Sequence, residues 1–242
     1  YADAEHALTA ALALEPRSVK ANFKLGLALE HQRQWARAEA AFRAAIRGKR
    51  DHATAWLRLA AACRRQGKAR EEEAAAREAV RLAPRSSEAC HALAVTLLRQ
   101  GRAVEAAGVF EATIALAPSN AIARYGLGLA LAAVGRDADA AAALGEAARL
   151  DPRPFKVHAQ QAEALRRLRR WGDAGMAYRA AAALRPNEPA LHGRLGMMLE
   201  RQRRYRDAVA AYSRAARLDG LSGRWRARLG RVQVGRTNRL AD

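Results

Sequence analysis

The stretch from Pro84 to Pro118 reads PRSSEACHALAVTLLRQGRAVEAAGVFEATIALAP, and its pattern decides the fold. The two prolines are 34 residues apart, and the same spacing continues along the chain. We number each unit so that these prolines stand at position 32. That position is occupied in turn by Pro16, Arg50, Pro84, Pro118, Pro152, Pro186 and Gly220. The phase is unbroken, which indicates one supersecondary unit repeated along the chain.

Small and large residues recur at fixed positions inside the unit. Position 8 holds Gly26, Ala60, Ala94, Gly128, Ala162, Gly196 and Gly230, and position 24 holds Leu8, Phe42, Ala76, Phe110, Leu144, Tyr178 and Tyr212. Positions 4, 7, 8 and 11 share one face of a helix, and positions 20, 24, 27 and 28 share one face of a second helix. We therefore predict two helices per unit, which approach closely at small residues. Proline at position 32 stops the second helix, and Gly67, Gly101 and Gly135 near position 15 make the turn within the unit.

The pattern resembles the tetratricopeptide repeat (TPR), whose signature is Leu at 7, Gly or Ala at 8, Ala at 20, an aromatic at 24, Ala at 27 and Pro at 32. The resemblance covers nearly all of the 242 residues. It implies an all-α fold, a right-handed superhelical α-solenoid of 34-residue helix-turn-helix units. We expect a single solenoid over 1–242. Its parts are a half repeat at 1–16, full repeats at 17–50, 51–84, 85–118, 119–152, 153–186 and 187–220, a further first helix at 221–235 and a tail at 236–242.

Two residues depart from the pattern at packed positions. Glu72 stands where the other units have Ala at position 20, and Gln161 stands where they have Leu at position 7. A polar side chain near a packed seam predicts local loosening or a specific partner.

The sequence begins at a second helix without its first helix, and neither end has a convincing polar cap. We therefore expect a larger parent protein.

Composition and motifs exclude several classes of protein. Half of the residues are apolar, so a packed core is expected, and two cysteines cannot form a disulfide scaffold. Cys63 and Cys90 fall at helix positions 11 and 4, as small buried thiols. The sequence has no membrane-length apolar stretch and no signal peptide. It also lacks catalytic, cofactor and metal-ligand motifs. We expect a non-catalytic, cytoplasmic segment that binds no cofactor or metal and does not insert into a membrane.

The resemblance implies a binding groove. TPR solenoids bind partners chiefly with first-helix residues that face away from the second helix. In this chain these positions supply a set that we call the groove residues: Lys20, Phe23, Lys24, Leu27, Arg58, His91, Val95, Tyr125, Leu129, Lys156 and Arg194. A contiguous exposed apolar strip usually marks a binding site. The alternative is that the strip packs against a neighbouring domain or a capping helix.

The net charge of +19 suggests a second surface. Basic residues gather at positions 12 to 16, near the turn between the two helices, and stacked units would align them. We call this predicted line the arginine ridge: Arg33, Arg65, Arg99, Arg102, Arg167, Arg170, Arg201 and Arg204. Arginine pairs bidentately with phosphate or carboxylate, so a polyanion could follow the ridge. The alternative is a solvated edge in an arginine-rich protein.

Three functions therefore stay open. The first is a protein-interaction scaffold that holds a peptide or protein segment with acidic groups. The second is a basic accessory module that binds an anionic polysaccharide or nucleic acid. It draws on a likeness of 25–30 and 195–200 to TPR modules of bacterial surface-polysaccharide transferases. The third is a structural spacer. Phe23, Tyr125, Phe155 and Trp225 lie outside the core positions and make a poor base-stacking platform. The sequence leaves the partner and the oligomeric state open.

Overall fold

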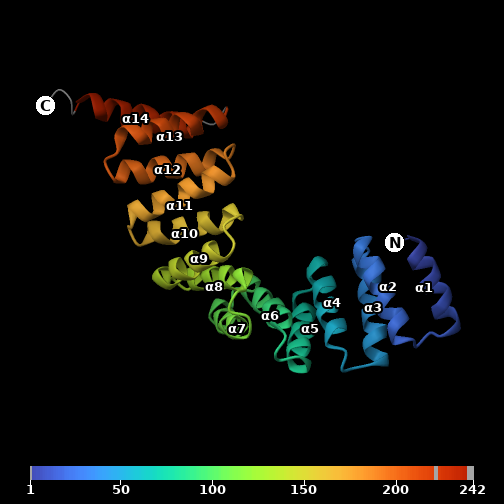
Figure 1. The fold of residues 1–242 in the computed structure, drawn as a ribbon. Helices are drawn as coiled ribbons and strands as arrows, with labels where there is room; N and C mark the ends of the chain where they lie inside the picture. Colours follow the sequence, from blue (N-terminus) through green and yellow to red (C-terminus); the bar gives the residue numbers. More distant parts are fainter. Residues whose placement is uncertain (1, 221–222, 239–242) are drawn as a thin grey trace. The chain divides into compact units, whose positions relative to one another are not determined.

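The computed structural model describes residues 2–220 and 223–238 and is shown in Figure 1. The chain divides into two compact units, Tyr1–Pro118 and Ser119–Asp242, and each is described by itself. All secondary structure in the described residues is helical. The all-α prediction is therefore confirmed. The single continuous solenoid and its right-handed superhelical sense stay predictions.

The fourteen helices of the described residues alternate as the repeat predicts. The second helices of the hairpins are α1 (Ala2–Leu14), α3 (Trp35–Gly48), α5 (Ala69–Leu82), α7 (Ala103–Leu116), α9 (Asp137–Leu150), α11 (Trp171–Leu184) and α13 (Tyr205–Leu218). The first helices are α2 (Val19–His31), α4 (Ala53–Arg65), α6 (Ser87–Arg99), α8 (Ala121–Ala133), α10 (Phe155–Arg167), α12 (Pro189–Arg201) and α14 (Arg224–Asn238). Each second helix from α1 to α13 ends two residues before position 32. Proline stops the helix there in five repeats, and α3 and α13 end at the same place although Arg50 and Gly220 occupy that position.

The turn within each hairpin uses a left-handed residue at position 15. Gly67, Gly101 and Gly135 have φ values of +73°, +80° and +79°. Arg33, Arg169 and Arg203 occupy the same position in the other units with φ values of 60°, 58° and 60°. The left-handed region costs an L-residue roughly 1–2 kcal/mol relative to glycine. The turn geometry is thus common to all six hairpins, and three of them carry an arginine at a strained position.

Hairpins close where a small residue at position 8 meets the large residue at position 24. A Cβ added at Gly26 would lie 2.5 Å from the ring of Phe42, and one added at Gly128 would lie 2.5 Å from Leu144. Phe42, Phe110, Leu144, Tyr178 and Tyr212 are fully buried. The predicted pairing of small and large positions is confirmed, because the large side chain fills the space that the missing Cβ leaves.

Successive hairpins are joined by a side-chain donor at position 4. It donates to the carbonyl at position 32 of the preceding repeat, in the linker six residues upstream. The bonds run from Asn22 Nδ2 to Pro16 O (3.1 Å), Trp56 Nε1 to Arg50 O (2.9 Å), Cys90 Sγ to Pro84 O (3.7 Å), His158 Nε2 to Pro152 O (2.9 Å), His192 Nε2 to Pro186 O (2.8 Å) and Arg226 Nη2 to Gly220 O (2.9 Å). Each histidine donates in the tautomer that carries the proton on Nε2. Chemically different side chains thus satisfy the same linker carbonyl.

Glutamine at position 14 makes a second link between hairpins. The side-chain amides of Gln66, Gln100 and Gln202 donate to the backbone oxygens of Trp35 (3.3 Å), Ala69 (3.1 Å) and Trp171 (2.9 Å), respectively. Each of these carbonyls belongs to the first residue of the second helix of the preceding hairpin. The bond therefore connects the end of each of these first helices to its neighbour.

The C-terminal helix departs from the predicted boundaries. The predicted further first helix at 221–235 is seen as α14, from Arg224 to Asn238, so helix continues into the predicted tail. A glycine such as Gly235 weakens a helix by about 1 kcal/mol but does not end it. Residues 221–222 and 239–242 lie outside the described residues. Trp225, which we placed outside the core, is buried against Gly193 and lies 6.3 Å from the Tyr212 ring.

Candidate functional site: the outer faces of the first helices

Seven groove residues belong to the unit that contains α2, α4 and α6. Lys20 and Lys24 are exposed, whereas the other five, Phe23, Leu27, Arg58, His91 and Val95, are half-buried. Phe23 is held in place by two rings, because it lies 4.8 Å from His52 and 5.8 Å from Phe42 between ring centroids. Its position is therefore set by the core beneath it.

Arg58 and His91 line one cavity between α2, α4 and α6. The cavity has a volume of about 220 Å³, and its walls also include Glu30, Leu57, Arg64, Glu72, Glu88 and Thr96. Arg58 Nη1 lies 3.6 Å from Glu30 Oε1, which is longer than a good hydrogen bond. The His91 ring packs 5.7 Å from the Phe110 ring. Burial lowers the pKa of His91, and the nearby charge of Arg64 lowers it further, so His91 is neutral near pH 7.

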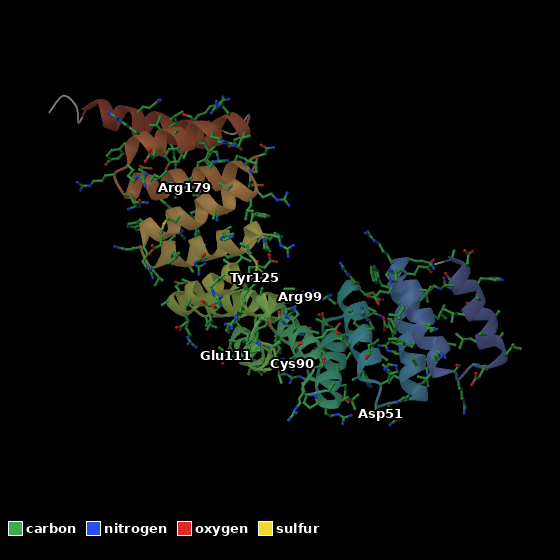
Figure 2. The ribbon with its side chains drawn as sticks, in the orientation of Figure 1. Asp51, Cys90, Arg99, Glu111, Tyr125 and Arg179 are labelled. Carbon is green, nitrogen blue, oxygen red and sulfur yellow. The ribbon has the colours of Figure 1, made fainter. Side chains whose placement is uncertain are left out.

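The other four groove residues belong to the unit that begins with α8. Tyr125 is half-buried on α8, where Figure 2 labels it, and burial raises the pKa of its hydroxyl. It lines a cavity of about 230 Å³ with Ile122, Ala147, Val157 and other residues, nearly all of them apolar at the cavity surface. Lys156 is exposed at the same cavity. Two predicted groove residues from neighbouring repeats are thus brought together here.

Leu129 and Arg194 are the remaining groove residues. Leu129 is half-buried on α8, and Arg194 is exposed on α12, with its Nη1 3.8 Å from Glu163 Oε2. Neither lines the cavity that Tyr125 and Lys156 share.

Arg194 lies near a carboxylate network, centred on Glu163, that the sequence did not predict. Glu163 on α10 accepts hydrogen bonds from Arg166 on its own helix and from the buried Tyr178 hydroxyl (2.8 Å) on α11. The hydrogen bond from Arg166 is the main cause that lowers the pKa of Glu163 to about 2, and Tyr178 adds to it against the opposing effect of burial. Burial and the same hydrogen bond raise the pKa of Tyr178 to about 12. In the next repeat the equivalent Tyr212 hydroxyl donates to a carboxylate from a different position of the first helix, Glu200 Oε2, at 2.7 Å.

The predicted arginine ridge makes contacts within its own chain. Five of its residues form ion pairs: Arg99 with Glu72 (2.9 Å), Arg102 with Glu73 and Glu105 (both 2.6 Å), Arg167 with Asp137 (3.2 Å), Arg170 with Asp173 (2.6 Å) and Arg204 with Asp207 (2.6 Å). Arg65 and Arg201 instead lie over the rings of Trp35 and Trp171, at 5.4 and 5.5 Å. Arg33 occupies the left-handed turn position. Much of the positive charge along this edge is therefore matched by carboxylates.

Two buried carboxylates accept hydrogen bonds from the following hairpin, and one of them, Glu72, pairs with the ridge residue Arg99. Glu39 and Glu72 are only 2% and 3% exposed. Glu72 accepts hydrogen bonds from Thr96 Oγ1 (2.9 Å) and from Arg99 Nη1 (2.9 and 3.0 Å), both on α6. Burial opposes ionisation of Glu39, but hydrogen bonds from Lys68 (2.7 Å) and Gln66 (2.6 Å) outweigh it and lower its pKa. We predicted either local loosening or a specific partner at Glu72, and the structure shows hydrogen-bond partners in the next hairpin.

Residues 2–220 and 223–238 contain no group of three side chains suited to a metal ion. Cys63 and Cys90 are free and buried, and burial raises the pKa of Cys63 to about 11, so neither is a reactive thiolate. Every helix of the described chain is too short or too polar to cross a bilayer. The cytoplasmic location stays a prediction.

Stacked helical hairpins of constant length, with small residues at the hairpin seam and an open first-helix face, define a class of helical repeat proteins. The tetratricopeptide repeat family model matches residues 1–51, 32–87, 91–156, 159–223 and 199–242. The chain therefore belongs to the tetratricopeptide repeat family, whose members generally act as non-catalytic protein-interaction scaffolds.

Solved structures share the fold at low sequence identity. PilF of Pseudomonas aeruginosa is 18% identical, with a TM-score of 0.72, over 88% of this chain and 97% of PilF. MamA of Desulfovibrio magneticus RS-1 is 20% identical, with a TM-score of 0.66, over 69% of this chain and 95% of MamA. YrrB, described as a TPR protein with an unusual peptide-binding site, is 17% identical, with a TM-score of 0.64, over 74% of this chain and 93% of YrrB. No curated protein matches the chain significantly.

Proposed function

We propose that the chain is a scaffold that holds a peptide or protein segment against the outer faces of its first helices. The observation that carries the proposal is the apolar cavity between α8 and α10, which brings the predicted groove residues Tyr125 and Lys156 together. Ile122 lines the same cavity, and this residue is 66% exposed. An exposed apolar surface of this kind is typical of a binding site.

The charge at the cavity favours an acidic segment. Asp151 also lines the cavity, but Arg153 already neutralises it through hydrogen bonds of 2.9 and 3.3 Å to its two carboxylate oxygens. The ammonium group of Lys156 therefore sets the sign of the charge at the edge. We infer a partner that places an apolar side chain in the cavity and an acidic group beside it. YrrB, which shares the fold, is described as having a peptide-binding site, and this supports a peptide as the partner.

The polyanion-binding alternative has less support. It needs the arginine ridge to be available to phosphate or sulfate groups, whereas Arg99, Arg102 and Arg167 already pair with carboxylates of their own chain. A polyanion would have to displace those carboxylates. Charge reversal at Arg167, Arg170, Arg201 and Arg204 distinguishes the two functions, because it removes polyanion binding and leaves peptide binding at the α8–α10 cavity in place.

The test is to select a random peptide library on the wild-type chain and to measure the selected peptides on variants. Tyr125→Ala with Ile122→Ala, two residues that line the cavity, is expected to weaken binding by at least about tenfold, which corresponds to about 1.4 kcal/mol. Met176→Ala is the matched control, because Met176 is a 63% exposed apolar residue of the second helix α11. Circular dichroism verifies that each variant is folded. Equal affinity for the double variant and the wild type would reject the α8–α10 cavity as the binding site.

A further inference from the structure

The cavity between α2, α4 and α6 has two buried polar atoms that lack partners. Arg58 Nε and His91 Nδ1 have no hydrogen-bond partner among the described residues, and both side chains line this cavity. Buried polar atoms in native proteins are nearly always hydrogen-bonded to protein, water or a ligand. An unpaired guanidinium nitrogen and an unpaired imidazole nitrogen on residues that line one cavity therefore indicate that the cavity holds a polar group from outside the chain.

The balance of charge indicates the sign of that group. Five charged side chains line the cavity: Arg58 and Arg64 of α4, Glu30 of α2, Glu72 of α5 and Glu88 of α6. Glu72 is already neutralised by Arg99. The two arginines then balance Glu30 and Glu88, and the neutral imidazole of His91 adds a site that can take up one proton. One additional negative charge is thus matched if His91 becomes protonated, whereas a dianion such as phosphate would leave an excess of negative charge.

We propose that this cavity binds the side-chain carboxylate of an acidic residue in a partner segment, held by Arg58, Arg64 and His91. The inference rests on the proposed peptide-binding function and adds a polar contact on the unit that contains α2, α4 and α6. Arginine is suited to this role because its planar fork matches the two oxygens of a carboxylate. A volume of about 220 Å³ leaves room for such a group.

The proposal links binding to pH. In the free protein, burial and Arg64 hold the pKa of His91 low. A carboxylate beside the ring favours the protonated form and raises that pKa. Binding must then strengthen as the pH falls from 8 toward 5, because protonated His91 is stabilised in the complex only. Glu30, Glu72 and Glu88 line the same cavity, as do Arg58 and Arg64, so the titration is followed at the His91 ring itself.

The experiment is an NMR titration of the His91 ring in the full chain, assigned with His91→Gln. The probes are N-acetyl-glutamate N-methylamide, which has only a side-chain carboxylate, and N-acetyl-alanine, which has only a terminal carboxylate. We expect the glutamate probe to raise the pKa of His91 by about one unit, which is a tenfold coupling between protonation and binding. If N-acetyl-alanine alone raised the pKa of His91, the cavity would bind the C-terminal carboxylate of a partner. That result would overturn the side-chain proposal.

Arg64→Gln is expected to abolish the response to the probe, and Arg85→Gln is the matched control because Arg85 is an exposed residue outside the cavity. Because removal of Arg64 also removes a cause of the low pKa, each variant is compared with and without the probe. A His91 pKa that the probe does not change in the wild type, or changes equally in Arg64→Gln, overturns the proposal. Failure of peptide capture at Tyr125 with an intact His91 response would overturn only the proposed function, since the two cavities share no residue.

Discussion

The pair of Glu72 and Arg99 tests whether a buried charge in this stack is stabilised across neighbouring hairpins. Glu72 is 3% exposed and belongs to α5, and Arg99, which is labelled in Figure 2, belongs to the C-terminal end of α6. Replacing Arg99 by Ala removes both guanidinium contacts and leaves the carboxylate with Thr96 alone. Glu72→Ala instead restores the small residue that other repeats have at position 20. We therefore compare Arg99→Ala, Glu72→Ala and the variant that carries both changes.

The magnitude follows from the burial of the two partners. Removing one partner of a fully buried ion pair costs about 3–5 kcal/mol, whereas an exposed pair contributes about 0–1 kcal/mol. The Arg99 side chain is 49% exposed and that of Glu72 is 5% exposed, so we expect Arg99→Ala to cost about 2 kcal/mol. Glu72→Ala should cost less than about 1 kcal/mol, because Arg99 can hydrate and Thr96 still donates to Ala92 O (2.9 Å).

The assay is native-state hydrogen exchange of the α5 and α6 amides. Stability in a repeat array is a sum of local terms, so a local measurement is more direct than a global unfolding midpoint. The amides of α11 to α13 are the internal reference, and Arg85→Ala is the control for loss of an exposed positive charge. We expect Arg99→Ala to have almost no effect in the Glu72→Ala background, which gives a coupling free energy of about 2 kcal/mol. An equal cost of Arg99→Ala in both backgrounds would refute the reasoning.

Three further predictions concern the hairpin turn, the hairpin seam and the carboxylate network. Gly101→Ala should cost about 1–2 kcal/mol because the φ of Gly101 is +80°, whereas Gly108→Ala in an open stretch of α7 should stabilise by about 0.5–1 kcal/mol; urea unfolding checks both signs. Gly196→Ala places a Cβ 2.8 Å from the Tyr212 ring, so its gain in helix propensity should be outweighed and thermal unfolding should show a net loss of about 1 kcal/mol. Glu163 has a folded pKa of about 2 against an ordinary value of 4.5, so its contribution, roughly 1–2 kcal/mol after screening, should be complete above pH 4.5 and lost as the pH falls toward 2; acid unfolding of Glu163→Gln should lack this component.

The helices and their seams could be predicted because they depend on residues of one repeat. Pro84 and Pro118 end helices by removing a donor and fixing φ, and this operates locally. Gly26 and Phe42 are 16 residues apart, but the hairpin brings them together in every repeat, so their sizes could be matched by position. The burial of Trp225 was not predicted, because it depends on Gly193 in the preceding repeat, outside the usual small position.

The candidate site was predictable only as a set of positions. Spacing placed Tyr125 and Lys156 on outward first-helix positions, but that they share a cavity depends on how α8 and α10 pack. The sequence also suggested a continuous arginine ridge, since Arg99 and Arg102 recur near the same turn. It did not show that Glu72 and Glu73 of the preceding repeat face them, because position 20 is usually a small residue. Side-chain pairing between repeats thus sets which charges stay available.

The same pairing explains why the residues at position 4 of successive repeats look unrelated. Asn22, Trp56, Cys90, His158 and His192 differ in size and polarity, yet each donates to the carbonyl at position 32 of the preceding repeat. The linker fixes that carbonyl six residues upstream, so any side chain with a donor at the right reach satisfies it. Leaving it unpaired costs up to about 1–3 kcal/mol where the bond is partly buried, as at Asn22, Cys90 and His192. Position 4 therefore selects for a donor and not for a shape. The outer positions beside it carry no such constraint, which leaves the first-helix face free to vary toward a partner.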